Sequence, residues 1–344
     1  MDRDREKLQR LQNHLCQHQL QRKAFDMSDM ILRHNPLNPA DNSPHDLAYV
    51  ETGDKNNTHV GQMKLLLADE MSIMLGLLHI CEQSKKTLQQ LTPQQGRFKV
   101  AVVVAGAAPG DHFADLVRTF RFVNFHLYDP APRGWFLPLT DRRKPPNVKL
   151  YSQEFTEQTA REWRDKKGYE HVIFLSDLRT GNGMDQDGVE GDMNLQAKIT
   201  KAIGACYSVL KFRPRYCWDH TPTADKTLKY FDGTIYLQGY PPNHSTETRL
   251  HVTDPASEKT YDIELYQDQL FYHNQVTRNP RCVLFEPGGL KYDDTHARFV
   301  KHFLLQHLPD VSDRQVRDPV GGFRFDHARL RALLEDFKLL GAHP

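Results

Sequence analysis

The sequence predicts an α/β fold in which a mostly parallel, twisted sheet carries helices on both faces. Three observations support this prediction. Short apolar runs of strand length alternate with longer segments of helical periodicity. The run at 99–105 is apolar at every position after Lys99, as expected for a strand buried on both faces. A glycine-rich turn at 106–110 follows it and leads into a helical stretch at 112–120, the arrangement of the first βα turn of a doubly wound sheet.

The other elements follow from the same patterns. Further strands are expected at 122–128, 148–151, 171–176, 207–212, 233–238 and 248–252. An apolar helix at 63–80 precedes the first strand, and a loop rich in Gly and Asp is expected at 180–192. A helix after this loop carries an apolar face made of Leu195, Ile199, Ala202, Ile203 and Cys206. A final amphipathic helix is expected between Asp326 as its N-cap and Gly341 as its stop.

These elements divide the chain into three parts. A helical and irregular extension occupies 1–58, one domain occupies 59–308, and a helical extension occupies 309–344. Five cysteines without a CxxC pair or zinc spacing favour reduced thiols and an intracellular protein. The sequence contains no apolar run of about 20 residues, so no membrane span is expected.

The charge balance limits how the protein could bind a nucleic acid. The 344 residues include 45 basic and 44 acidic side chains, so the formal net charge is only +1. Binding would therefore depend on a local groove rather than on a basic field over the whole surface. Basic residues near predicted strand ends could line such a groove: Arg142, Arg143, Lys144, Arg179, Arg213 and Arg215.

The turn at 106–110 indicates the kind of cofactor. It is neither GxGxxG nor a phosphate loop with Gly-Lys-Ser/Thr, which argues against a dinucleotide or a triphosphate. Its small residues let the backbone approach a ligand closely. Asp129 directly follows the strand at 122–128, where an acid can accept hydrogen bonds from a ribose diol. These features favour a cofactor that carries adenosine without a pyrophosphate, and the alternative is a buried turn beside a surface aspartate.

Five sequence blocks in a fixed order carry a resemblance to a known family. They are 61–67 (GQMKLLL), 106–112 (GAAPGDH), 173–179 (IFLSDLR), 210–213 (LKFR) and 245–250 (STETRL). With a later echo at 270–285, the likeness spans roughly residues 45 to 305. The chain resembles the poxvirus-type cap-specific mRNA (nucleoside-2′-O-)-methyltransferases, which also serve as small subunit of a poly(A) polymerase. The resemblance implies a Rossmann-like methyltransferase fold and S-adenosylmethionine as cofactor.

The resemblance also implies which residues act. The catalytic set is Lys64, Asp177, Lys211 and Glu247, and Lys211 would deprotonate or polarise a ribose 2′-hydroxyl without a metal. A lysine can do this only when it is partly neutral, a state that burial and a second cation favour. The implied cofactor contacts are Gln62, Gly106, Gly110, His112, Asp129 and Phe155. Taken singly, these residues have structural explanations: Lys64 could be a helix boundary residue, and Glu247 with Arg249 an edge-strand ion pair.

Recognition of the cap departs from the family pattern. Tyr216 and Tyr49 would supply the two rings between which a cationic 7-methylguanine stacks, and His244 falls where the family has a third aromatic residue. Trp218 and Gln267 stand where the family has acids. Because Asp219 and Asp268 are adjacent to them, either the geometry is shifted by one residue or the RNA end is bound differently.

Three functions remain open from the sequence. The first is methylation of a ribose next to the mRNA cap. The second is methylation of another RNA ribose, since other RNA ribose methyltransferases use a similar Lys/Asp/Lys/Glu set. The third is an RNA-binding processivity subunit for a poly(A) polymerase, with methylation secondary or lost. The expected partners are capped mRNA and a polymerase catalytic subunit, and the family implies action in the cytoplasm.

Overall fold

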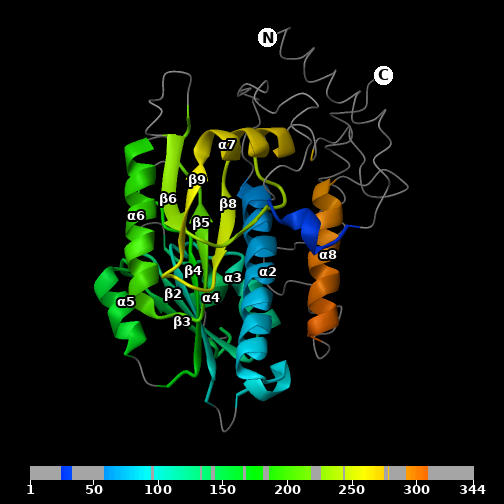
Figure 1. Cartoon of the computed structure of the whole chain (residues 1–344). Coiled ribbons are helices and arrows are strands. Elements are labelled where there is room, and N and C mark those ends of the chain that lie inside the picture. Colours follow the sequence, from blue (N-terminus) through cyan, green and yellow to red (C-terminus); the bar gives the residue numbers. More distant parts are fainter. Residues whose placement is uncertain are drawn as a thin grey trace.

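A seven-stranded sheet forms the centre of the protein (Figure 1). The computed structural model describes residues 25–32, 58–93, 97–131, 134–140, 144–165, 168–180, 186–217, 226–242, 245–274, 278 and 292–308. The strands of the sheet are β1 (Val100–Ala105), β2 (Val123–Tyr128), β3 (Val148–Tyr151), β4 (His171–Ser176), β5 (Tyr207–Phe212), β7 (Thr234–Tyr236) and β8 (Thr248–Val252). Every strand expected from the sequence is therefore present.

The strand order is β3-β2-β1-β4-β5-β8-β7. Strands β1 to β5 run parallel, β8 is antiparallel to β5, and β7 is antiparallel to β8. The chain winds from β1 outward to β3 and then returns to continue from β4 in the other direction. This reversal creates a crevice at the carboxyl ends of β1 and β4, which is where open α/β sheets bind ligands. The sequence-based prediction of a mostly parallel, Rossmann-like sheet is confirmed.

Helices cover both faces of the sheet. One face carries α2 (Thr58–Ser84) and α3 (Phe113–Thr119), with α8 (Tyr292–His307) packed on the outside of α2. The other face carries α5 (Glu157–Arg164) and α6 (Gln186–Ile203) (Figure 1). Strand β1 shows why both layers form, because Val100, Val102 and Val104 enter the first core while its alternate residues enter the second.

Smaller elements complete the described chain. A two-stranded ribbon of β6 (Thr227–Phe231) and β9 (Glu258–Asp262) leads into α7 (Ile263–Tyr272). Three further short helical segments are η1 (Met27–Met30), η3 (Leu88–Leu91) and α4 (Leu137–Thr140). The segment after η1 extends the sheet edge, since the Leu32 amide donates to the Ile235 carbonyl at 2.8 Å. Within the described residues, no helix has the length and apolar character needed to cross a membrane.

Two element boundaries differ from the prediction. Helix α6 begins at Gln186, so the loop expected at 180–192 is shorter, because burial of Val189 and Met193 stabilises helix despite neighbouring glycines. The same helix ends at Ile203, where Gly204 adopts a φ of +67°. Cys206 therefore lies outside the helix, and its thiol donates to the Val172 carbonyl at 3.0 Å.

The terminal extensions are described only in part. Thr58 is the first residue of α2 rather than the last of an irregular segment, so α2 is longer than the helix expected at 63–80. The remainder of the extension at 1–58, apart from 25–32, lies outside the described residues. The helix predicted between Asp326 and Gly341 lies outside them as well.

Candidate active site

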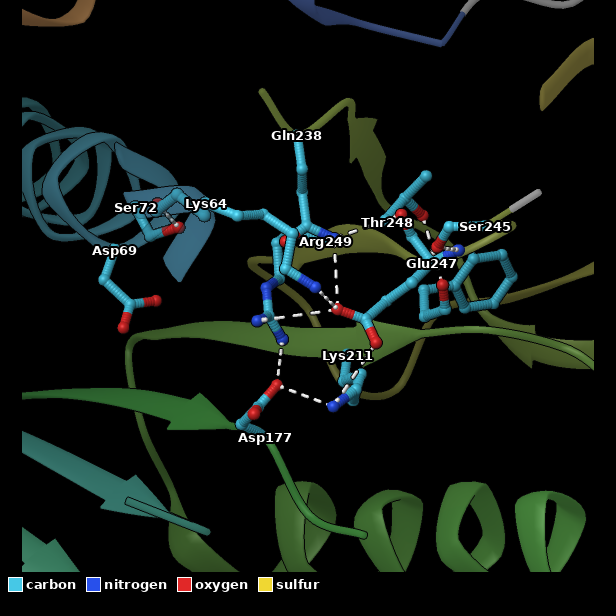
Figure 2. A network of polar contacts seen from close by, with 12 residues as sticks. Lys64, Asp69, Ser72, Asp177, Lys211, Gln238, Ser245, Glu247, Thr248 and Arg249 are labelled. Atoms are coloured by element: carbon cyan, nitrogen blue, oxygen red, sulfur yellow. Dashed lines mark hydrogen bonds and ion pairs between the residues drawn. The ribbon is translucent and has the colours of Figure 1, made fainter. Parts of the chain in front are cut away.

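Four residues from separate elements meet at the carboxyl end of the sheet (Figure 2). Lys64 comes from α2, Asp177 directly follows β4, Lys211 lies in β5, and Glu247 directly precedes β8. Glu247 accepts a hydrogen bond from Lys64 Nζ at 2.8 Å through Oε1, and its Oε2 lies 3.3 Å from Lys211 Nζ. Lys211 Nζ also lies 3.1 Å from Asp177 Oδ1. The structure thus brings together the four residues proposed as catalytic.

Arg249 is a fifth member of this group that the sequence did not single out as functional. Its Nη1 donates to Asp177 Oδ1 at 2.7 Å, and its Nη2 lies 4.0 Å from Glu247 Oε1. The side chain is only 4% exposed, so this is no surface ion pair on an edge strand. The two-residue spacing from Glu247 was the available signal, because strand residues two apart lie on one face. Lys64, Asp177, Lys211, Glu247 and Arg249 are called the ion-pair cluster below.

The cluster keeps its carboxylates ionised. Burial acts to raise the pKa of Asp177, but the positive charges of Lys211 and Arg249 outweigh it and hold that pKa below its ordinary value. Burial opposes ionisation of Glu247 in the same way, and Lys211, Lys64 and Arg249 together hold its pKa well below the usual range. For Arg249 burial acts to lower the pKa, whereas the two carboxylates raise it above its ordinary value. Both acids are therefore hydrogen-bond acceptors at neutral pH.

The segment that carries Glu247 is tied down by polar contacts. Gln238 Nε2 donates to the Glu247 carbonyl at 3.0 Å, and the Glu247 amide donates to Ser245 Oγ at 3.1 Å. Asn274 Nδ2 donates to the Ser245 carbonyl at 2.6 Å, and Arg278 Nε donates to Asn274 Oδ1 at 3.0 Å. The carboxylate is therefore positioned by its backbone as well as by its ion pairs.

A pocket opens beside the ion-pair cluster. The turn at 106–110 forms one wall, Gln62, Leu65 and Asp69 of α2 form another, and Asp177 and Arg249 connect it to the cluster. The turn fits tightly against the end of β4: Gly106 has a φ of +82°, and a Cβ atom there would lie 2.7 Å from the Asp177 carbonyl oxygen. Only glycine suits this position, and its small size brings the backbone against the pocket.

Comparison with known proteins assigns the family. A family model described as Poly A polymerase regulatory subunit matches residues 37–313. The chain belongs to this family. Two curated relatives are named cap-specific mRNA (nucleoside-2′-O-)-methyltransferase, from the Lausanne and Uriarra strains of Myxoma virus. Each is 25% identical over 263 residues, which cover 70% of this chain and 68% of the relative. The resemblance seen in the five sequence blocks is confirmed.

The expected cofactor contacts fall into two groups. Four of them line the pocket: Gln62, Gly106, Gly110 and His112. Asp129 lies beside the turn, where its carboxylate accepts from the Ala108 amide at 3.2 Å and from the Ala131 amide at 2.7 Å. Phe155 is buried in the core of the opposite sheet face, against Tyr128 and Phe174. It is not among the residues that line the pocket, so its contact with adenine stays a prediction.

The expected cap-binding residues are described only in part. Tyr216 is half-buried, with the Arg213 guanidinium 5.1 Å from its ring centroid and the Phe271 ring stacked at 6.3 Å. Asp268 is buried on α7. The side chain of Gln267 makes two hydrogen bonds to the Cys217 backbone. Its Oε1 accepts from the Cys217 N–H at 2.9 Å, and its Nε2 donates to the Cys217 carbonyl at 3.0 Å. Tyr49, Trp218, Asp219 and His244 lie outside the described residues.

The basic residues expected to line a groove are partly neutralised. Arg179 lies 3.6 Å from the buried Asp192, and Arg215 lies 3.5 Å from Glu190. Lys144 is exposed. Arg142 and Arg143 lie outside the described residues. The groove therefore stays a prediction.

Proposed function

We propose that this protein transfers a methyl group from S-adenosylmethionine to the ribose 2′-oxygen of a nucleotide next to the mRNA cap. The observation that carries the proposal is the ion-pair cluster, in which Lys211 contacts both Asp177 and Glu247 beside a pocket lined by a glycine turn. The names of the two curated relatives support the same reaction.

The charges of the cluster suit Lys211 as the group that accepts a proton. Three cations, Lys64, Lys211 and Arg249, face two carboxylates, so the fully protonated cluster carries a formal charge of +1. Loss of one proton from Lys211 leaves the cluster neutral, while Asp177 and Glu247 keep Arg249 and Lys64 as partners. A neutral amine at this position can take the proton of a ribose hydroxyl.

The cofactor fits the residues that are present. When bound, S-adenosylmethionine supplies a methyl group attached to a positively charged sulfur, and this sulfur becomes a neutral thioether when the methyl group is transferred. The turn at 106–110 would hold it by close backbone approach, and Asp129 would accept from its ribose hydroxyls. Lys211 takes the proton as the 2′ O–H bond breaks, and the ribose oxygen forms its bond to the methyl carbon. Asp177 and Glu247 hold the lysine in line with that oxygen, and such positioning accounts for much of the rate gain.

The test is transfer of a labelled methyl group to a short RNA with and without an N7-methylated cap. Wild type, Lys211→Ala and the exposed control Lys198→Ala are compared, followed by digestion to locate the label. We expect label at a ribose 2′-oxygen of capped RNA in the wild type and the control, and a loss of at least about 100-fold in Lys211→Ala. Equal labelling of capped and uncapped RNA would favour another RNA ribose as substrate. No transfer to either RNA would refute the enzymatic proposal.

A second function, as a regulatory subunit of a poly(A) polymerase, is favoured by the family match. It needs RNA binding and a polymerase contact, and it does not need the ion-pair cluster to act chemically. The same Lys211→Ala variant separates the two functions. Stimulation of polyadenylation that survives the loss of methyl transfer would show that both functions reside in one chain.

A further inference from the structure

Asp69 is a buried acid on the pocket wall. Among the described residues it makes no ion pair with a member of the ion-pair cluster, although its negative charge helps to raise the pKa of Arg249. Its side chain is 11% exposed and lines the pocket together with Gln62 and His112. Its Oδ2 lies 3.1 Å from His112 Nε2, and Nδ1 of the same ring lies 3.1 Å from Gln62 Oε1. Figure 2 shows the Asp69 carboxylate apart from the ion pairs of the cluster. Across the described parts of the chain, Asp69 Oδ1 has no hydrogen-bond partner.

The two acids of the pocket differ in how their charge is balanced. Asp177 contacts two cations, Lys211 and Arg249. Asp69 contacts one imidazole, and that ring reaches only one of the two carboxylate oxygens whatever its protonation state. A carboxylate whose side chain is only 11% exposed loses much of its contact with water, and a donor group on the ligand would replace that contact at the unpaired oxygen. The free oxygen of Asp69 therefore indicates a cationic or hydrogen-bond-donating group on the ligand.

The position of Asp69 indicates which ligand group that is. Asp129 lies beside the turn at the end of β2, on the side proposed for the ribose, and the ion-pair cluster lies where the methyl group is transferred. Asp69 lies on a third side, on the wall formed by α2. With the adenine expected near Phe155, the amino-acid end of the cofactor is the part left for this wall, and its α-ammonium is a cationic donor that matches a carboxylate oxygen.

We propose that Asp69 binds the α-ammonium group of S-adenosylmethionine, and that His112 and Gln62 act as positioning residues for the Asp69 carboxylate. This rests on the proposed function, because it presumes that cofactor in this pocket. His112 bridges Gln62 near the start of α2 to Asp69 two turns later, so the ring fixes the carboxylate against α2. The contact is made to cofactor and demethylated product alike, since both carry the ammonium group.

The test combines a change in the protein with a change in the ligand. The full chain is titrated calorimetrically with S-adenosylhomocysteine and with its deaminated analogue, so that no turnover occurs. We expect the wild type to prefer the ligand that carries the ammonium group by about 10-fold to 100-fold. Asp69→Asn should lose affinity for S-adenosylhomocysteine by a similar factor and bind the analogue within about twofold of wild type. Glu157→Gln, which removes one negative charge from the surface of α5, is the matched control.

The outcomes separate this proposal from the function it rests on. If Asp69→Asn weakens both ligands equally, the residue supports the pocket in general and the assignment to the ammonium group is wrong. If the wild type binds the two ligands equally well, the assignment is wrong without reference to any variant. If the wild type binds neither ligand and transfers no methyl group, the cofactor itself is wrong and the proposed function fails with it.

Discussion

Lys211 and Arg249 stand opposite each other in the antiparallel pair of β5 and β8, and both reach the same oxygen of Asp177. The Lys211 amine lies 3.1 Å from Asp177 Oδ1 and the Arg249 guanidinium lies 2.7 Å from it. A guanidinium stays charged at every accessible pH, whereas an amine can lose its proton. Arg249 therefore supplies Asp177 with a cation that does not depend on the charge of Lys211.

Arg249→Met should destabilise the fold strongly. It removes a buried, permanent cation from two carboxylates whose side chains are 27% and 12% exposed, and breaking a buried ion pair from one side costs about 3–5 kcal/mol. Urea unfolding at neutral pH measures this loss, and Arg249→Lys should recover part of it because the charge is kept. The exposed Arg121→Met serves as control and should change the free energy of unfolding by less than about 0.5 kcal/mol. A fully stable Arg249→Met would mean that the cluster does not depend on this cation.

Gly106→Ala should weaken both the fold and cofactor binding. Its φ of +82° disfavours any side chain, and the new Cβ would lie 2.7 Å from a backbone oxygen that cannot move independently of β4. We expect a loss of at least about 1–3 kcal/mol in thermal or urea unfolding, with a lower affinity for S-adenosylhomocysteine. Gly61→Ala is the matched control, since its Cβ would meet nothing within 4 Å and alanine favours helix. Equal behaviour of the two variants would contradict the role of the turn.

The sequence predicted the main sheet because its strands are buried on both faces. Uninterrupted apolar runs such as 100–105 carry that signal, and all seven strands of the main sheet were identified. The ribbon of β6 and β9 was missed, since its residues are mostly polar and its strands stay half exposed. The start of α6 was missed because glycines near it resemble a loop, and helix forms there through burial against the domain.

The sequence analysis named four members of the ion-pair cluster and missed the fifth, Arg249. Lys64 and Glu247 are 183 residues apart, so only the likeness to a family could connect them before the fold was known. Arg249 was missed because its role depends on β8 lying between β5 and β7, an order that local sequence does not encode. The hydrogen bonds of Gln267 to the Cys217 backbone could not be foreseen for the same reason.

Stability should fall as the pH is lowered from about 6.5, because of His251. Burial, with a smaller contribution from Arg249, lowers the pKa of this histidine to about 3, while Tyr207 and Ser72 contact its two ring nitrogens. Below the unfolded value of about 6.5 the unfolded chain binds a proton that the folded chain rejects, so folding loses up to about 1.4 kcal/mol per pH unit across that window. Urea unfolding at several pH values measures how steeply the free energy of unfolding falls with decreasing pH.

His251→Gln should flatten this slope, whatever it does to stability at neutral pH. The buried His273 and His296 also have lowered pKa values and keep their share of the pH dependence. The exposed His302→Gln is the control and should leave the slope unchanged. An unchanged slope in His251→Gln would mean that this histidine does not drive the acid response.

Gln267→Glu tests the prediction that this position belongs to a cap pocket, because the resemblance implies an acid where this chain has glutamine. The glutamine donates to the Cys217 carbonyl at 3.0 Å, and a carboxylate would instead place a negative oxygen against that carbonyl. We expect a loss of about 1–3 kcal/mol in the free energy of unfolding and weaker binding of a 7-methylguanosine cap analogue, because Tyr216 precedes Cys217 directly. Fluorescence titration of the analogue and urea unfolding measure the two effects, with the exposed Gln306→Glu as control. Tighter cap binding by Gln267→Glu at unchanged stability would show instead that the pocket keeps the family's geometry and lacks only the acid.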